Sequence, residues 1–181
     1  RFANFDFDEI KNEVKEVLNI VKDRYNAIDL PKGLDGTNII IDGEEVCDVF
    51  EYFTEDLEYM SKFTHTNLFE LDKSAQGDDV QGTPLTLTMM PYYLGASGSR
   101  SIDADGISLK ECNIIKNGVA KARWGDNTSA YFIGEKNPTG DLPILKVEKG
   151  DISFKDMAKK PYIRCVRFSS MQMDRLSGLV G

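Results

Sequence analysis

The stretch from Cys112 to Arg123 reads CNIIKNGVAKAR and decides how the second half of the chain folds. Asn117-Gly118 lies at its centre, with short runs rich in apolar residues on both sides. Asn-Gly supplies the positive φ angles that a type I′ turn requires. We therefore predict a β-hairpin over residues 112–123.

Short β-type segments surround this hairpin. Residues 85–89 follow Pro84 and alternate with period two, which predicts a strand with one solvent-facing side that ends at Pro91. Further short strands are predicted at 37–41, 130–133, 144–148 and 163–168. Because these strands dominate the second half of the chain, we expect an antiparallel sheet there.

Helical patterns are concentrated nearer the N-terminus. Residues 8–26 carry apolar side chains at steps of three and four, with Asp6 or Asp8 as the cap: Ile10, Val14, Val17, Leu18, Val21 and Tyr25. A second helix is predicted after Asp42, with its apolar positions at Val46, Val49, Phe50, Phe53, Leu57 and Met60. A short helix over residues 154–158 should start near Asp151. The predicted class is α+β, mainly antiparallel sheet in a sandwich or partly open barrel, with two helices in the N-terminal third.

The breakers Pro31, Gly33 and Gly36 indicate a connection after the first helix. We therefore divide the chain into a helix and connection, residues 1–35, and a domain, residues 36–181. Residues 64–83 are polar and contain glycine, and we expect a long loop there.

Composition excludes several classes of function. The 181 residues carry a formal net charge of −8, whereas a nucleic-acid binder needs clustered Lys and Arg. The apolar runs are too short to cross a membrane. Cys47, Cys112 and Cys165 are far apart and odd in number, which argues against a disulfide framework and favours a reducing cytoplasm.

The sole histidine, His65, limits the metal and nucleophile chemistry that the chain can support. Cys47, Glu51 and His65 are residue types that bind zinc, and Cys47 with His65 could form a nucleophile pair. Because Cys47 adjoins the apolar stripe of the predicted helix, we favour a cysteine packed as a small hydrophobe.

The glycine-rich segment 95–100 lacks the Gly-Lys-Ser/Thr ending of a phosphate loop. Asp103, Asp105 and Gly106 lack the closing Glu of a calcium loop, so turn chemistry accounts for them better.

Residues 98–106, GSRSIDADG, resemble the Gly-Ser-Arg-Pro-Phe-Asp-x-Glu-Gly segment of the TldD/PmbA family, formerly called modulator of DNA gyrase. Further blocks follow in family order at 113–119, 124–131, 138–140, 147–151 and 168–179. The resemblance covers residues 36–181, and it lies in the order of blocks that are individually weak. It implies that the chain corresponds to the C-terminal portion of the family's proteins and is truncated at both ends relative to full-length members.

The resemblance implies a family with two types of member. TldD-type members carry a His-Glu-x-x-x-His zinc helix, whereas PmbA-type (TldE-like) members lack this helix and pair with an active subunit. The corresponding segment here, residues 46–57, contains no histidine. The expectation is thus a chain with no catalytic residue, metal or cofactor of its own, and zinc in an active partner. The expected partners are a TldD-like subunit, which would carry the zinc, or a second copy of this chain in a dimer.

The ligand implied by the resemblance is an unfolded or extended peptide held in a cleft. Nucleic acid and a membrane are not expected as partners, because of the net charge and the short apolar runs described above. Arg100 and Asp103 are the predicted binding residues that order its wall, unless they only fix a surface turn. Two alternatives stay open: an active zinc metallopeptidase with atypical ligands, and a free-standing β-rich binding domain.

Overall fold

The computed structural model describes residues 5–29, 31–34, 36–43, 45–168 and 171–174. The elements in these ranges, in chain order, are α1 Phe7–Tyr25, β1 Asn38–Ile41, α2 Glu45–Asp56, α3 Tyr59–Phe63, β2 Leu87–Met90, β3 Cys112–Lys116, β4 Val119–Ala120, α4 Asn127–Ile133, β5 Ile144–Val147, α5 Phe154–Met157 and β6 Tyr162–Cys165.

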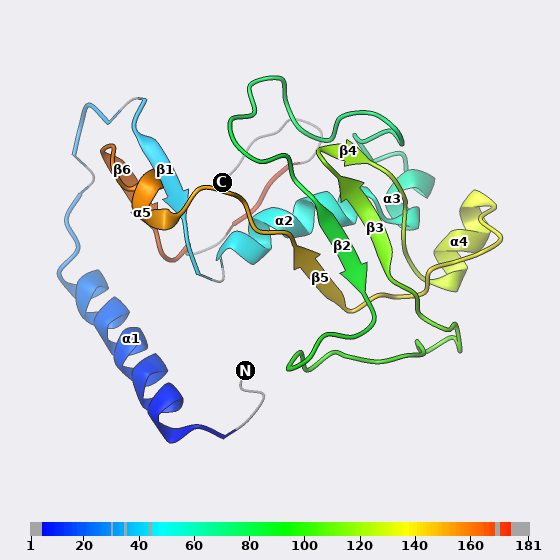
Figure 1. Cartoon of the computed structure of the whole chain (residues 1–181), viewed down its shortest axis with the longest axis horizontal. Helices are drawn as coiled ribbons and strands as arrows, with labels where there is room; N and C mark the ends of the chain where they lie inside the picture. The colour runs from blue at the N-terminus through cyan, green and yellow to red at the C-terminus, as the bar shows by residue number, and fades with distance from the viewer. Residues whose placement is uncertain (1–4, 30, 35, 44, 169–170, 175–181) are drawn as a thin grey trace.

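The larger sheet is four-stranded and antiparallel, with the order β4-β3-β2-β5. The predicted hairpin is confirmed: Ile115 pairs with Ala120, and the turn residues Asn117 and Gly118 have φ angles of 50° and 76°. The sheet is open, and α2 covers one of its faces (Figure 1). The predicted α+β class and mainly antiparallel sheet are confirmed.

The core lies between α2 and this sheet. Its buried members are Leu57, Ala75, Leu87, Met89, Leu109, Cys112, Ile114, Ile115, Ala120, Trp124 and Leu142. The apolar stripe predicted for α2 faces it, since Phe50 and Phe53 pack against these residues. The buried Asp56 carboxylate accepts hydrogen bonds from the Leu68 and Phe69 N–H groups at 2.6 and 2.9 Å. Asp56 thereby anchors the predicted long loop, residues 64–83, to the end of α2.

A second, two-stranded sheet pairs β1 with β6. The two strands are parallel, with Asn38 opposite Tyr162, so this pair differs from the antiparallel pairing of the larger sheet. Parallel strands need a long crossover between them, and the whole four-stranded sheet lies within that connection. Arg164 closes the pair through an ion pair with Asp42.

The strand predicted at residues 130–133 is wrong, because these residues form the end of α4. The Asp126 side chain accepts a hydrogen bond from Ser129 N–H at 2.9 Å, and Gly134 ends the helix at φ 77°. These two caps outweigh the strand preference of the aromatic and β-branched residues between them.

Two smaller predictions are corrected. Residues 85–89 do not have a solvent-facing side at Thr88, which is buried and whose hydroxyl donates to the Asn113 side chain at 2.8 Å. The short helix α5 is capped by Ser153 and not by Asp151, because the Ser153 hydroxyl accepts from Asp156 N–H.

Helix α1 lies apart from the sheet in Figure 1. Asp6 caps it as predicted, by accepting from the N–H groups of Asp8 and Glu9. Its apolar stripe is not covered by other described residues: Val14, Val17, Leu18 and Val21 are 53% to 61% exposed. Within the described ranges, no helix combines the length and apolar character needed to cross a membrane. The division of the chain at residue 35 stays a prediction.

Candidate functional site

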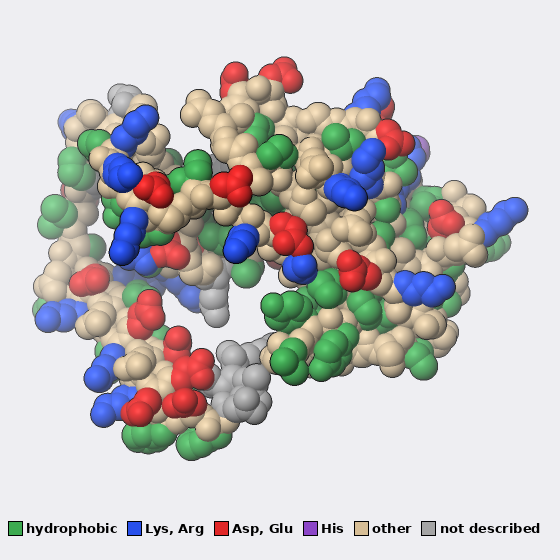
Figure 2. All heavy atoms as spheres, in the orientation of Figure 1, with side chains coloured by type: hydrophobic (Ala, Val, Ile, Leu, Met, Phe, Trp, Pro, Cys, Tyr) green, Lys and Arg blue, Asp and Glu red, His purple; other side chains and the backbone are tan. Residues whose placement is uncertain are grey.

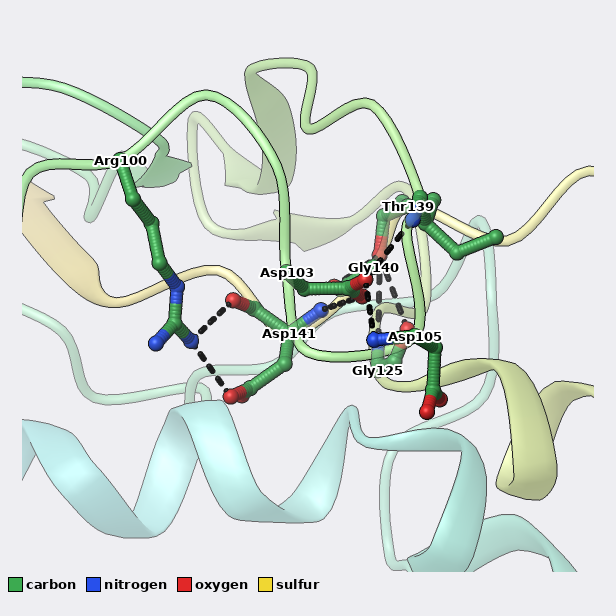
Figure 3. Close-up of polar contacts among 8 residues, drawn as sticks. Arg100, Asp103, Asp105, Gly125, Thr139, Gly140 and Asp141 are labelled. Atoms are coloured by element: carbon green, nitrogen blue, oxygen red, sulfur yellow. Dashed lines mark hydrogen bonds and ion pairs between the residues drawn. The ribbon is translucent and has the colours of Figure 1, made fainter.

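The predicted binding residue Asp103 lies in the loop that joins β2 to β3 (Figure 3). Its carboxylate accepts three backbone hydrogen bonds, from the N–H groups of Asp105 at 3.0 Å, Ile107 at 2.8 Å and Asp141 at 3.2 Å. Burial raises the pKa of Asp103, but these hydrogen bonds and the charge of Arg100 outweigh burial and hold it below its usual value. Asp103 is therefore an ionised centre that orders the loop.

Arg100 also contacts Asp141, the residue whose N–H donates to Asp103. Its Nη2 donates to Asp141 Oδ2 at 2.6 Å and to the Asp141 carbonyl oxygen at 2.8 Å, as Figure 3 shows. The structure thus brings the two predicted residues together through Asp141, a residue that sequence reasoning missed. Because Asp141 is 41 positions from Arg100, no local sequence pattern could have revealed it.

Gly140 fixes the other side of this contact. It pairs with Gly125 in an isolated bridge, and Thr139 Oγ1 accepts from Gly125 N–H at 3.0 Å. A Cβ at Gly140 would overlap the Leu109 side chain, so the 139–141 turn packs closely against the β2–β3 loop. The two loops therefore form one ordered unit.

This unit sets the entry of β5, because Asp141 lies three residues before Ile144. Ile144 pairs with Met90 at the end of β2, just before the β2–β3 loop begins. The contacts of Arg100 and Asp103 with Asp141 order the two loops that lie next to the start of β5. Whether these residues also touch a ligand stays a prediction.

The outer edge of β5 is open in the described part of the chain. Glu148 N–H donates to the Thr86 carbonyl at 3.1 Å, so the pair Thr86–Glu148 is hydrogen-bonded. Hydrogen-bonded and non-hydrogen-bonded pairs alternate in an antiparallel ladder, and β2–β5 has an unbroken register. The N–H and C=O groups of Leu145 and Val147 therefore point away from β2.

The opposite edge of the sheet, at β4, is already occupied. Ala120 N–H donates to the Lys73 carbonyl, and Asp72 and Ala75 N–H donate to the carbonyls of Ala120 and Gly118. Residues 72–75 thus cover β4 as an extra strand would. Of the two edges of this sheet, β5 is the one left free by the described residues.

Apolar and charged side chains flank the β5 edge. Tyr92, Tyr93 and Leu94, at the start of the β2–β3 loop, are at least 53% exposed, and Figure 2 shows hydrophobic side chains gathered there. Lys146 forms an ion pair with Glu148 at 2.5 Å. The hydrogen bond and charge of Glu148 raise the pKa of Lys146, with smaller effects from the nearby Glu111 and Tyr93.

The candidate metal ligands do not form a site. In the part of the chain that the structure describes, no group of three or more His, Cys, Asp and Glu side chains is placed to hold a metal ion. Cys47 and Glu51 lie exposed on α2, and His65 lies exposed in the loop after α3. The packed position predicted for Cys47 is wrong, because the sheet-facing side of α2 is taken by its neighbours in the apolar stripe. These residues do not fit the zinc centre that an active member would need.

Comparison with known families identifies the domain. The family model described as PmbA/TldA metallopeptidase C-terminal domain matches residues 35–178. The chain belongs to this family. The resemblance noted over residues 36–181 is thereby confirmed. A sequence search of curated proteins gave no match.

Solved structures share the fold. One is named as a modulator of DNA gyrase from Bacteroides thetaiotaomicron VPI-5482, with TM-score 0.62 and 23% identity over 77% of this chain and 32% of that chain. A second, named as a modulator of a DNA gyrase from Thermotoga maritima MSB8, has TM-score 0.59 and 20% identity over 77% and 34%. A third is TldE from Thermococcus kodakarensis, with TM-score 0.58 and 15% identity over 74% and 33%. The chain spans about a third of the length of these relatives.

Proposed function

We propose that this chain is a non-catalytic part of a TldD/TldE-like metallopeptidase system in the cytoplasm, and that it binds an extended peptide along the free edge of β5. The observation that carries this proposal is the outward direction of the Leu145 and Val147 backbone groups. An extended peptide satisfies such groups by adding a strand, which gives affinity through main-chain hydrogen bonds.

The non-catalytic role is supported by the residues available for zinc. The chain has one histidine, and a hydrolytic zinc site uses three protein ligands, usually with more than one imidazole. We therefore assign peptide hydrolysis to a TldD-like partner subunit that carries its own zinc. Within the proposed assembly, Arg100, Asp103 and Asp141 hold the loops at the entry of β5 so that the edge is ordered before the peptide arrives.

Substitution of Val147 tests the edge directly. Val147→Pro removes one outward N–H and leaves the hydrogen bonds to β2 intact, and proline is tolerated on edge strands in this orientation. The loss of one main-chain hydrogen bond should weaken binding of an unfolded polypeptide roughly two- to tenfold. Val147→Thr is the matched control, because it keeps the N–H and the β-branched shape.

Binding is measured by fluorescence anisotropy with a labelled, reduced and unfolded polypeptide, and hydrogen exchange should show slower exchange at Leu145 and Val147. Equal binding by both variants would refute a role for the β5 edge. Catalysis is tested separately by adding zinc to the purified chain. Stoichiometric zinc together with peptide hydrolysis by the chain alone would refute the non-catalytic role.

A further inference from the structure

The sheet-facing stripe of α2 is incompletely covered by the described residues. Leu57, just after the helix, is fully buried, whereas the stripe residues within the helix are only partly buried: Val46, Val49, Phe50 and Phe53. In Figure 1, this half of α2 extends past the free edge of β5. The sheet ends at β5 before the helix does, so no described strand of this sheet lies over that half of α2.

A strand added to β5 would lie over this half of α2. Side chains of directly opposed residues in a sheet point to the same face. Leu145 packs against the core beneath the sheet, so peptide residues opposite Leu145 and Val147 would also point toward α2. The peptide residue between them would point to the other face, beside Lys146 and its ion-pair partner Glu148.

We infer that the β5 edge selects an extended peptide with apolar residues at two alternate positions and a polar residue between them. The apolar side chains fill the space between α2 and the strand positions Leu145 and Val147. The middle side chain meets a positive and a negative charge that compensate each other, which favours a neutral polar residue. This inference rests on the proposed function and adds the chemical class of the peptide.

The peptide runs antiparallel to β5. The rest of this sheet is antiparallel, and antiparallel pairing is slightly more stable per residue than parallel pairing. In antiparallel pairing, the peptide residues opposite Leu145 and Val147 direct their own N–H groups at β5. The two apolar residues therefore donate the hydrogen bonds, and the N–H of the polar residue between them points to solvent.

Two peptides of identical composition test the pattern on the complete chain. Ser-Thr-Val-Thr-Val-Thr-Ser places both valines on the α2 side, whereas Ser-Thr-Val-Val-Thr-Thr-Ser places one valine on the opposite face. Loss of one buried valine should weaken binding about tenfold, measured by isothermal titration calorimetry. N-methylation of either valine in the first peptide should weaken binding further, and N-methylation of its central threonine should have little effect.

The outcomes separate this inference from the proposed function. Equal affinity for both peptides, with both weakened by Val147→Pro, would overturn the apolar pattern and leave the β5 edge in place. Greater sensitivity to methylation at the central threonine than at the valines would overturn the antiparallel register. No binding of either peptide at millimolar concentration would overturn the inference and, if unfolded polypeptide also fails to bind, the proposed function.

Discussion

Replacing Gly140 by alanine tests the close packing that orders the loops beside β5. Gly140 has φ 75°, and an added Cβ would overlap the Leu109 side chain and lie 2.8 Å from Asp103 Oδ2. Leu109 is part of the buried core, and Asp103 is held by three backbone hydrogen bonds, so neither can move freely. The substitution should therefore cost both backbone strain and overpacking.

Gly106 provides the matched control. It has a similar φ of 81°, but an added Cβ there meets no atom within 4 Å. Alanine at a left-handed position costs about 1–2 kcal/mol, and overpacking of a filled site costs about 1–3 kcal/mol. We expect Gly106→Ala to lose about 1–2 kcal/mol of unfolding free energy, and Gly140→Ala about 2–5 kcal/mol.

Urea unfolding followed by the fluorescence of Trp124, the single tryptophan, measures both losses. Trp124 is buried and its Nε1 donates to the Thr54 carbonyl at 2.9 Å, so its emission should report loss of the core. If both variants lose the same free energy to within about 0.5 kcal/mol, the reasoning about Gly140 fails, because backbone strain alone would then account for the result.

Three further outcomes are expected. The folded-state pKa of Asp103 is lowered, so the ionised carboxylate stabilises the fold fully above the usual aspartate pKa, and this stabilisation is lost as pH falls through the folded-state pKa. When the free energy of unfolding is measured against pH in acid, Asp103→Asn should therefore show a weaker dependence on pH in that range. An unchanged dependence would contradict this. Burial raises the pKa of the Cys112 thiol to about 11, so a thiol reagent at pH 8 should modify the exposed Cys47 quickly and Cys112 only after unfolding, as mass spectrometry of the labelled peptides will show. Removal of residues 1–34 should leave the unfolding midpoint of the remaining domain unchanged within error, since no described residue of α1 is buried; a large fall in the midpoint would contradict the division at residue 35.

Sequence patterns predicted those parts of the fold that depend on local chemistry. The Asn117-Gly118 turn fixes the hairpin through its own φ angles, and Asp6 caps α1 from two residues away. The error at residues 130–133 was also local, because Asp126 and Gly134 were available as caps on either side. Capping by these two residues outweighs the strand preference of residues 130–133.

Other features depend on residues that are far apart in the chain. Asp103 and Arg100 were predicted from a family resemblance, but their common neighbour Asp141 is brought in by the turn at Gly140. The strand over residues 144–148 was predicted without its place at the sheet edge, because strand order is set by pairing across the whole domain. The candidate binding edge therefore could not be predicted from the sequence alone.

The parallel pair β1–β6 has a consequence for the order of folding. In the sequence, Asn38 precedes and Tyr162 follows all the strands of the four-stranded sheet. Closing this pair before the sheet forms would therefore cost the entropy of a very long loop. A two-stranded pair alone is marginally stable in water. The ring of Phe154, which lies against both Tyr162 and Arg164, supports the pair from the same late segment of the chain. The hairpin of β3 and β4 should thus nucleate the domain, and β1–β6 should join last and be the first pair to separate when native hydrogen exchange is followed over time.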